Sequence, residues 1–397
     1  MTDGLHLADG TADVLDSLRR SLTGCGVTAP LPADHAERER TVAMLRPEIS
    51  VAEADAAAVV ATSGSTGRPR GVVLSRSALI ASAEATHRRL GGPGTWVLAL
   101  PAHYVAGLMV LVRSLVADRP VLEVDGRLDG LRGLELTGDG PHYLSVVPTQ
   151  LTRALADPDR AAALRRFDAV LLGGSAADPS LLDRAATAGI AVVTTYGMSE
   201  TCGGCVYDGI PLDGVDVAAD ASGRLSIGGP TVFAGYRLDP VATADALSGG
   251  RLLTRDRGEV GRDRRVTVLG RLDDVVVSGG LNVDLAAVER AVRAWAGDEA
   301  AVVGVPDPEW GTAVVAVVAE RQNQALTAPA LKDERSDGTV SARFFLSDLR
   351  TALSATLPGY ALPRRLVVRR SLPRTSGGKI DRRRLIAELT AMPEDAT

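Results

Sequence analysis

The sequence contains few aromatic residues, few cysteines and no long hydrophobic segment. Only 3% of its 397 residues are aromatic, and the cysteines are Cys25, Cys202 and Cys205. Three cysteines cannot form the disulfide framework of a small secreted protein, and one Cys-x-x-Cys pair without further Cys or His partners favours neither zinc nor redox chemistry. The N-terminal residues also lack the charged and then apolar pattern of a signal peptide. We therefore expect a cytoplasmic protein.

No apolar run approaches the roughly 18 residues that a membrane helix needs. The apolar run at residues 106–116 is shorter and contains Arg113. A basic excess is also missing, because the formal net charge is -5, and this argues against a surface for nucleic acid. The expected partners are therefore small molecules, with no nucleic acid and no integral membrane contact.

The pattern of apolar runs predicts an α/β fold with more than one domain. Short runs rich in β-branched residues end in Gly, Ser, Thr or Pro and alternate with helix-like stretches, at residues 56–63, 95–101, 143–148, 167–174 and 190–197. This alternation is typical of layered sheets with largely parallel, buried strands. Residues 203–269 instead favour an antiparallel or barrel-like section. We expect a large N-terminal domain over residues 1–270 and a small α+β domain over residues 271–397.

Residues 62–72, Thr-Ser-Gly-Ser-Thr-Gly-Arg-Pro-Arg-Gly-Val, directly follow one of these apolar runs. Hydroxyls and glycines after a strand allow backbone N–H groups to converge on an anion. The order of residues differs from the common P-loop, which needs a Gly-Lys-Ser/Thr ending. Arg68 and Arg70 add positive charge, so the pattern indicates a phosphate-binding loop more than a plain Gly/Ser turn.

Residues 196–201, Tyr-Gly-Met-Ser-Glu-Thr, follow a second apolar run. A carboxylate beside hydroxyls at the end of a strand is a candidate Mg²⁺ site, because magnesium prefers oxygen ligands and shares them with nucleotide phosphates. Glu200 is the candidate metal ligand. For Tyr196, a place in the core is an equal alternative.

Two further patterns lie toward the C-terminus. Residues 254–258 and 270–274 combine carboxylates with arginines, which could bind a ribose diol but are also common on surface turns. Residues 372–381 carry Lys379 after a pair of glycines, where a lysine could reach a phosphate or carboxylate as a mobile charge. A basic tail is the simpler alternative for this last segment.

Together, and in this order, the four patterns resemble the adenylate-forming superfamily of acyl-CoA synthetases, carrier-protein adenylation domains and luciferases. The resemblance covers about residues 56–385. It implies ATP, Mg²⁺ and coenzyme A as cofactor and cosubstrates, a large N-terminal domain with the substrate site, and a mobile C-terminal domain with a catalytic lysine.

The resemblance also implies roles for individual residues. Those that would bind the nucleotide or coenzyme A are Ser63, Gly64, Ser65, Thr66, Gly67, Gly173, Gly174, Ser175, Tyr196, Gly197, Ser199, Asp256, Arg271, Gly279 and Gly280. Those that would act in catalysis are Lys379, Arg70 and Glu200, with Glu200 also on magnesium, and Asp273 would be the hinge. The phosphate loop departs from the family pattern at Arg70, where a lysine is usual.

Residues 100–113 are most similar to the o-succinylbenzoate-CoA ligases of menaquinone biosynthesis, especially actinobacterial ones. That resemblance implies a dicarboxylate substrate, for which Arg113 is the candidate partner because a buried unpaired charge is costly. An internal ion pair is the alternative for Arg113. The remaining candidates for the acyl pocket are His103, Tyr104 and Gly107, and the family histidine is uncertain by one residue between the first two.

Several alternatives stay open at this point. The chain could activate another aryl or acyl acid, or it could load the phosphopantetheine of a carrier protein. A regulatory module without catalysis is disfavoured because Glu200, Asp256 and Lys379 are all present. The oligomeric state is undetermined, with a homodimer one of the alternatives.

Overall fold

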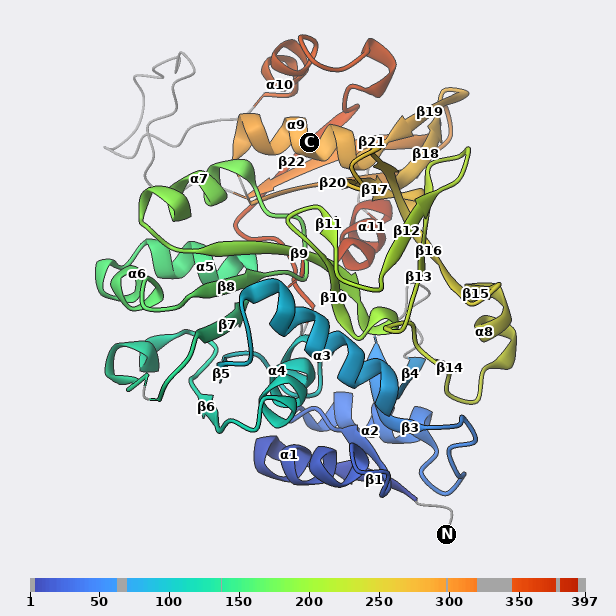
Figure 1. The fold of residues 1–397 in the computed structure, drawn as a ribbon. Coiled ribbons are helices and arrows are strands. Elements are labelled where there is room, and N and C mark those ends of the chain that lie inside the picture. The colour runs from blue at the N-terminus through green and yellow to red at the C-terminus, as the bar shows by residue number, and fades with distance from the viewer. Residues whose placement is uncertain are drawn as a thin grey trace. The chain divides into compact units, whose positions relative to one another are not determined.

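The computed structural model describes residues 4–62, 70–136, 138–297, 299–319, 345–375 and 379–391. The chain divides into two compact units (Figure 1). The first unit contains residues 1–254 and 258–267, and the second contains residues 255–257 and 268–397.

The first sheet of the large unit is built by the N-terminal segment. Its strands lie in the order β1 (Leu5–Ala8), β2 (Val27–Pro30), β3 (Ala56–Thr62), β4 (Arg70–Ser75) and β14 (Gly235–Tyr236). The first three are parallel, whereas β3–β4 and β4–β14 are antiparallel. Helices α1 (Gly10–Ser21) and α2 (His35–Leu45) pack on opposite faces, because alternate strand residues point to opposite sides.

A second, seven-stranded sheet forms the centre of the large unit. Its order is β11 (Ile210–Pro211), β10 (Gly203–Tyr207), β9 (Val192–Met198), β8 (Ala169–Leu172), β7 (His142–Val146), β5 (Thr95–Leu98) and β6 (Val121–Glu123). The strands from β9 to β6 are parallel, β10 is antiparallel to β9, and β11 is antiparallel to β10. Four of the parallel strands, β5, β7, β8 and β9, are ones that the apolar runs predict, since a sheet covered on both faces needs continuous apolar segments, whereas β6 lies outside those runs.

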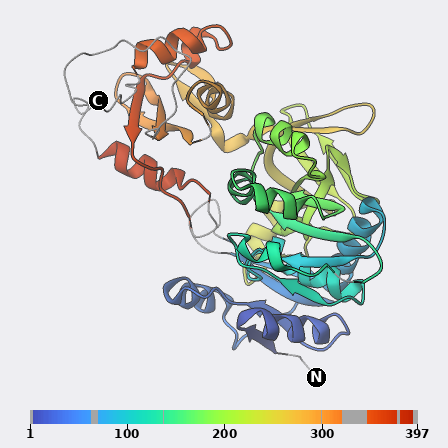
Figure 2. The same ribbon diagram turned by 90° about the vertical axis from the view of Figure 1, so that its left-hand side faces the viewer.

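Helices cover both faces of this sheet, as Figures 1 and 2 show. Trp96 and Leu98 of β5 face the core shared with α3 (Arg76–Leu90) and α4 (Val105–Val116), while Val97 between them faces the opposite core. That opposite core is shared with η1 (Asp129–Gly133), α5 (Pro148–Leu155), α6 (Pro158–Leu164) and α7 (Pro179–Thr187).

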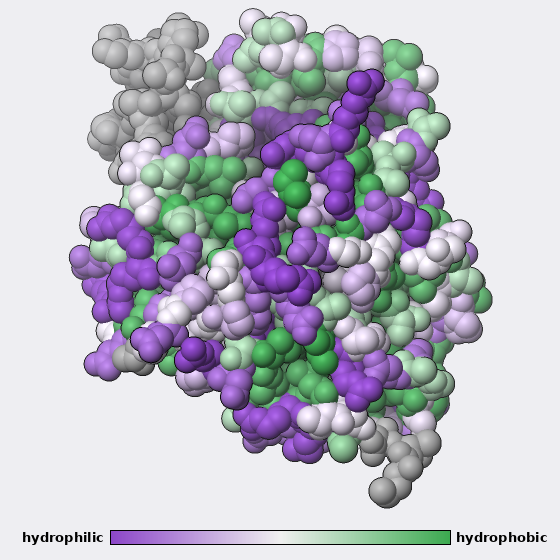
Figure 3. Space-filling model, viewed as in Figure 1, coloured by the Kyte–Doolittle hydropathy of each residue, from purple (hydrophilic) through white to green (hydrophobic). Residues whose placement is uncertain are grey.

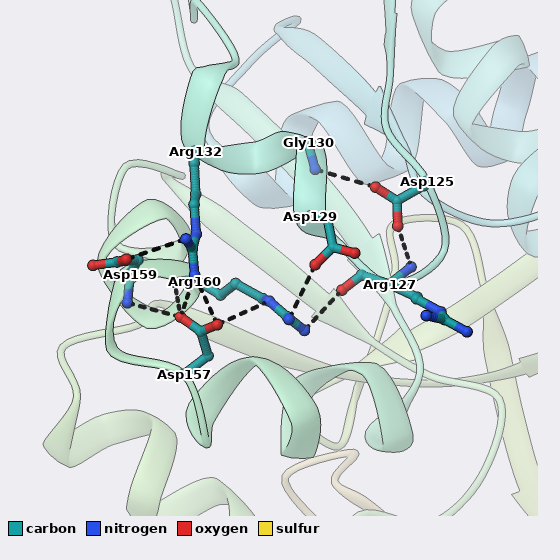
Figure 4. Close-up of polar contacts among 8 residues, drawn as sticks. All are labelled: Asp125, Arg127, Asp129, Gly130, Arg132, Asp157, Asp159 and Arg160. Atoms are coloured by element: carbon teal, nitrogen blue, oxygen red, sulfur yellow. Dashed lines mark hydrogen bonds and ion pairs between the residues drawn. The ribbon is translucent and has the colours of Figure 1, made fainter.

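An arginine and aspartate cluster joins η1 to α6 (Figure 4). Arg132 Nη2 donates to both carboxylate oxygens of Asp157, at 2.9 and 2.8 Å. Arg160 Nη2 lies 3.0 Å from Asp129 Oδ1, and Arg160 Nε lies 3.3 Å from Asp157 Oδ2. Asp157 is also the N-cap of α6. One carboxylate therefore caps a helix and holds two arginines.

Part of the section that the sequence predicts to be antiparallel or barrel-like forms a sheet of its own, whereas β10, β11 and β14 belong to the two sheets described above. Its order is β12 (Asp216–Ala219), β13 (Arg224–Gly228), β16 (Arg251–Val260) and β15 (Leu247–Ser248), with β17 (Val266–Arg271) also on β16 and α8 (Pro240–Ala246) before β15. The β12–β13 and β15–β16 pairs are antiparallel, which confirms that part of the prediction.

The small unit contains a hairpin and a three-stranded sheet. The hairpin joins β18 (Val275–Ser278) to β19 (Leu281–Asp284), and the sheet has the order β20 (Ala300–Asp307), β21 (Gly311–Ala319) and β22 (Arg365–Arg369). Helices α9 (Leu285–Ala296) and α10 (Leu346–Leu353) cover one face of the sheet, and α11 (Arg382–Thr390) covers the other. The short helices η3 (Leu272–Asp274) and η4 (Gly359–Ala361) complete the unit.

These elements confirm the predicted class, a mixed α/β protein with several sheets and a separate C-terminal part. Hydrophilic and apolar residues alternate over the face seen in Figure 3. Within the described ranges, no helix is long and apolar enough to span a bilayer.

Candidate active site

Three parallel strands of the seven-stranded sheet, β5, β8 and β9, lead into segments that carry predicted site residues. Their carboxyl ends lie at one edge of the sheet, because all three run in the same direction within one parallel set. Ligands of open α/β sheets bind at this edge. The predicted residues found here are His103, Tyr104, Gly173, Gly174, Ser175, Tyr196, Gly197 and Ser199.

Two glycines at this edge are required by close packing. A Cβ added to Gly173 would lie 2.5 Å from Thr195 Oγ1, and one added to Gly197 would lie 2.0 Å from the carbonyl oxygen of Gly203. Gly174 has φ of +86°, which side chains rarely adopt. The backbone can therefore pass close to the neighbouring strand just where β8 and β9 end.

Glu200 is held in a tight turn after β9. The turn is the short helix η2 (Ser199–Thr201), and the Thr201 hydroxyl accepts a bond from Met198 N at 2.9 Å and lies 2.7 Å from the Gly203 carbonyl oxygen. Cys202 follows in the left-handed conformation with φ of +52°. These contacts reverse the chain into β10 and leave Glu200 half-buried beside the sheet edge.

Tyr236 connects Glu200 to Arg70. Its hydroxyl donates to Glu200 Oε1 at 2.8 Å, and the Arg70 guanidinium lies 5.2 Å from the centre of its ring. Burial, and then the Glu200 carboxylate, raise the pKa of Tyr236 well above its usual range. The phenol therefore stays protonated and acts as a hydrogen-bond donor. Arg70 Nε also lies 4.0 Å from Asp239 Oδ2.

The predicted phosphate-loop residues Ser63, Gly64, Ser65, Thr66 and Gly67 lie outside the described residues. Their two flanks are described. Thr62, the last residue of β3, pairs across the hairpin with Arg70, the first residue of β4.

The chemistry around Glu200 fits a magnesium ion that is shared with a nucleotide. Tyr236 donates to its Oε1, so Oε2 carries no bond from this hydroxyl and is the oxygen better placed to bind a cation. Within the described ranges, no group of three or more His, Cys, Asp or Glu side chains is placed to hold a metal alone. Magnesium commonly takes one or two carboxylates and completes its shell with substrate phosphates and water.

The candidates for the acyl pocket His103, Tyr104 and Gly107 lie together at the start of α4. The rings of His103 and Tyr104 are 4.1 Å apart, and a Cβ on Gly107 would lie 2.3 Å from the Pro101 carbonyl oxygen. Burial lowers the pKa of His103, while Glu37 raises it to a smaller extent. At neutral pH this imidazole therefore acts as a neutral hydrogen-bonding group.

Arg113 lies at the other end of α4, in its last turn. Nine residues separate it from Tyr104, which corresponds to about 14 Å along a helix. Its guanidinium lies 4.8 Å from the centre of the Trp96 ring, and its Nη2 donates to the Tyr207 hydroxyl at 3.3 Å. Arg113 is only 3% exposed, and none of the ion pairs found among the described residues includes it. The structure thus does not place Arg113 beside His103.

The small unit brings together four of the predicted residues. Arg271 Nη1 lies 3.9 Å from Asp256 Oδ1, and Arg271 Nη2 lies 3.3 Å from Asp273 Oδ2. Part of Lys379 is exposed, yet burial of its ammonium and the positive charge of Arg271 lower its pKa, whereas Asp256 raises it. The predicted ribose and lysine positions therefore share one charged cluster.

Backbone hydrogen bonds hold the two sides of the Lys379 segment together. Thr375 N donates to the Lys379 carbonyl oxygen at 2.8 Å, and Asp381 N donates to the Pro373 carbonyl oxygen at 2.8 Å. Asp381 is in turn the N-cap of α11. The main chain at Lys379 is thus connected directly to the start of a packed helix.

Gly279 and Gly280 form the turn between β18 and β19, with φ of +58° and +80°. A Cβ on Gly279 would lie 2.8 Å from the Trp310 ring, and Gly279 N donates to the Trp310 carbonyl oxygen at 3.0 Å. The Arg364 guanidinium lies 3.8 Å from the centre of the same ring. The turn therefore packs on an aromatic side chain, and a Cβ added to Gly280 would meet no atom within 4 Å.

Sequence reasoning missed Tyr236 and Trp310. Tyr236 lies in the segment Ala-Gly-Tyr-Arg, where a tyrosine has the pattern of an ordinary strand residue. The only signal in the sequence is general, because a tyrosine in a strand that becomes buried usually finds a hydrogen-bond partner for its hydroxyl. Its partner could not be identified without the structure.

Comparisons with known proteins agree with this geometry. Residues 11–238 match the AMP-binding enzyme family, and residues 289–379 match the AMP-binding enzyme C-terminal domain. A probable 2-succinylbenzoate–CoA ligase of Mycobacterium tuberculosis is 42% identical over 96% of this chain and 97% of its own length. A 2-succinylbenzoate–CoA ligase of Geobacillus kaustophilus is 31% identical over 83% of this chain and 69% of its own length.

A solved structure has the same fold. The o-succinylbenzoate coenzyme A synthetase of Bacillus subtilis, in complex with ATP and magnesium ion, superimposes with a TM-score of 0.69 at 25% identity. The match covers 96% of this chain and 84% of the other. The expected resemblance to adenylate-forming acyl-CoA synthetases is confirmed, and the chain belongs to the AMP-binding enzyme family.

Proposed function

We propose that this protein is an AMP-forming ligase that activates o-succinylbenzoate as an acyl-adenylate and transfers the acyl group to coenzyme A, a step of menaquinone biosynthesis. The observation that carries this proposal is the 42% identity to a probable 2-succinylbenzoate–CoA ligase over nearly the whole of both chains. The alignment of Gly174, Tyr196 and Glu200 at one sheet edge supports it, because this edge is where α/β folds bind nucleotides.

In the first half-reaction the substrate carboxylate attacks the α-phosphorus of ATP. We assign Ser63, Gly64, Ser65, Thr66 and Gly67 to the β- and γ-phosphates and Ser199 to the α-phosphate. Glu200 would hold magnesium, which neutralises phosphate charge when it is bound. Arg70 and Lys379 supply further positive charge as pyrophosphate leaves. No protein nucleophile is needed for this step.

The remaining assignments concern binding. Asp256 and Arg271 would bind the ribose, with Gly173, Gly174, Ser175, Tyr196 and Gly197 around the adenine and the acyl group. Thioester formation would use Gly279 and Gly280, where the absence of a side chain lets pantetheine approach. A domain boundary near residue 270 and a hinge at Asp273 would let the C-terminal domain change pose between the two half-reactions. We place the enzyme in the cytoplasm, where ATP and coenzyme A are available.

The first test is a substrate panel. Purified protein is incubated with ATP, Mg²⁺, coenzyme A and o-succinylbenzoate, benzoate, succinate or a medium-chain fatty acid, and AMP and thioester are measured. We expect o-succinylbenzoate to give the highest kcat/KM. A different preferred acid would keep the ligase chemistry and overturn the substrate. Adenylate without transfer to free coenzyme A would favour loading of a carrier protein, and no AMP from any acid would overturn the ligase.

Arg113 needs its own test, because it lies about 14 Å along α4 from Tyr104. If Arg113 binds the second carboxylate, Arg113→Lys should raise KM for o-succinylbenzoate more than KM for benzoate, since only the first has a second carboxylate. If Arg113 only packs on Trp96, the two KM values should change together. Thermal unfolding of Arg113→Lys separates either outcome from a loss of the folded protein.

A further inference from the structure

Tyr236 contacts both an anionic and a cationic residue of the assigned phosphate region. It reaches this position from a distant part of the chain, 36 residues after Glu200. Its hydroxyl bonds to Glu200 Oε1, and its ring lies against the Arg70 guanidinium. Neither residue is a sequence neighbour, so the contact is created by the sheet.

The backbone around Tyr236 is fixed on several sides. Tyr236 pairs with Val72 in the β4–β14 ladder, and its N–H donates to Thr243 Oγ1 at 2.8 Å. The next residue, Arg237, is 5% exposed and donates from its side chain to carbonyl oxygens at the end of α2 and just after it, including Leu45 at 2.9 Å. The Tyr236 ring is therefore held by a paired strand and not by a free loop.

The ring and the carboxylate are also fixed to each other. Phe233 packs edge-on against Tyr236 with ring centres 4.9 Å apart, and Phe233 N donates to the Glu200 carbonyl oxygen at 2.9 Å. The segment that carries Tyr236 thus contacts the main chain and the side chain of Glu200. A hydroxyl held in this way limits the rotation of the carboxylate and selects which of its oxygens remains available.

We propose that Tyr236 is a positioning residue for the phosphate-bound metal: its hydroxyl orients Glu200 so that Oε2 faces the metal, while its ring separately supports Arg70. This inference rests on the proposed function, because that function assigns the metal to Glu200. It predicts that the two parts of the side chain have separable effects. Loss of the hydroxyl should weaken metal binding, and loss of the ring should weaken the binding of pyrophosphate as well.

The test measures metal affinity without turnover. Mn²⁺ is titrated by electron paramagnetic resonance in the presence of α,β-methylene-ATP, for the unsubstituted protein and for Tyr236→Phe. Loss of a hydrogen bond that orients a metal ligand typically weakens metal affinity about 10- to 100-fold, and we expect a change in this range. Tyr236→Leu should weaken Mn²⁺ to a similar extent and in addition raise the Kd of inorganic pyrophosphate, which Tyr236→Phe should leave nearly unchanged.

Two controls make the result specific. Tyr143→Phe removes another buried hydroxyl, which bonds to the Leu90 and Gly92 carbonyl oxygens far along the chain from Glu200, and it should leave Mn²⁺ affinity unchanged. In a Glu200→Gln background, Tyr236→Phe should have little further effect, because contacting residues are not additive. Thermal unfolding of each variant verifies that it is folded.

Equal Mn²⁺ affinity for the unsubstituted protein and Tyr236→Phe would overturn the inference, as would an undiminished effect in the Glu200→Gln background. These outcomes are independent of the substrate panel. If no acid yields AMP while Tyr236→Phe still weakens Mn²⁺, the proposed ligase fails and the positioning role remains. If AMP forms and Mn²⁺ affinity is unchanged, the ligase remains and the positioning role fails.

Discussion

The environment of single buried residues sets their charge in this protein. His87 is 4% exposed, and Trp96 Nε1 donates to its Nε2 at 3.1 Å. Burial, and then the positive charge of Arg113, lower the pKa of His87 to about 4. His87 is therefore neutral at physiological pH and accepts a hydrogen bond at the edge of the Trp96 ring. His87, Trp96 and Arg113 are all buried, so these polar side chains form part of the hydrophobic core.

The lowered pKa of His87 predicts a loss of stability in acid. Between pH 6.5 and pH 4 the unfolded chain binds a proton at this residue that the folded chain does not, so stability falls as the pH falls. From His87 alone, the free energy of unfolding should be about 3 kcal/mol lower at pH 4 than at pH 7. Urea unfolding across this range measures the slope. His87→Gln should reduce the slope, and an unchanged slope would contradict the assignment.

The lowered pKa of Lys379 should also be visible in the pH dependence of adenylation. A lysine that stabilises the transition state must be protonated, so adenylation should decline on the alkaline side at a lower pH than an ordinary lysine would give. Lys379→Ala should reduce the adenylation rate by about 10² to 10³, as for loss of one preorganised donor. ATP–pyrophosphate exchange against pH measures both effects.

Two comparisons separate the charge of Lys379 from its structure. Lys379→Arg should shift the alkaline decline to higher pH, because arginine stays protonated. Thioester formation from prepared acyl-adenylate should suffer less than adenylation in Lys379→Ala. Equal losses in both half-reactions would count against a role limited to adenylation.

At the scale of elements, a buried carboxylate joins α9 to α11 and to the central sheet of the small unit. Glu289 is 7% exposed and accepts bonds from Arg382 Nη2 at 2.8 Å to each oxygen. It also accepts from Val302 N at 3.0 Å and pairs with Arg293 Nη2 at 2.7 Å. Arg382 begins the helix that follows Lys379, so this contact holds the Lys379 segment to the rest of the unit.

Removing this carboxylate should destabilise the small unit strongly. Hydrogen bonds to a charged group typically contribute about 1.5 to 3 kcal/mol, and this substitution leaves the partly exposed Arg382 and Arg293 and the Val302 N–H without their acceptor. Glu289→Ala should therefore lower the unfolding free energy within this range, measured by urea denaturation. Glu299→Ala, which removes the exposed partner of Arg374, is the matched control and should cost much less. Equal losses would show that burial is not the cause.

At the scale of the whole molecule, the two units have separate hydrophobic cores. Helices α9, α10 and α11 pack on a three-stranded sheet of their own, while the seven-stranded sheet carries the helices of the large unit. Chains with separate cores commonly unfold in more than one step. We expect two transitions in differential scanning calorimetry.

Two substitutions assign these transitions to the units. Glu289→Ala should lower one melting temperature, and Arg160→Ala, which opens the cluster of Figure 4, should lower the other. If both variants shift a single common transition, the units unfold as one cooperative body and the expectation is wrong.

Much of the architecture could be predicted from the sequence because it depends on local pattern. The runs at residues 95–101, 167–174 and 190–197 became β5, β8 and β9, since continuous apolar segments require a sheet covered on both faces. The glycines and hydroxyl residues at the end of each of these strands could also be recognised from the sequence. The antiparallel pairing of β3 with β4 could not be predicted, because strand direction depends on pairing between segments and not on composition.

The sequence by itself determined the family, the alternation of strands and helices, and the residue types of the site. Only the tertiary structure decided which side chains meet. Tyr236 reaches Glu200 and Arg70 because β14 pairs with β4, and Arg113 lies far from Tyr104 because a helix separates them. Asp256, Arg271 and Lys379 meet because distant segments fold into one unit. Sequence pattern specifies local conformation, whereas contacts between distant residues follow from packing.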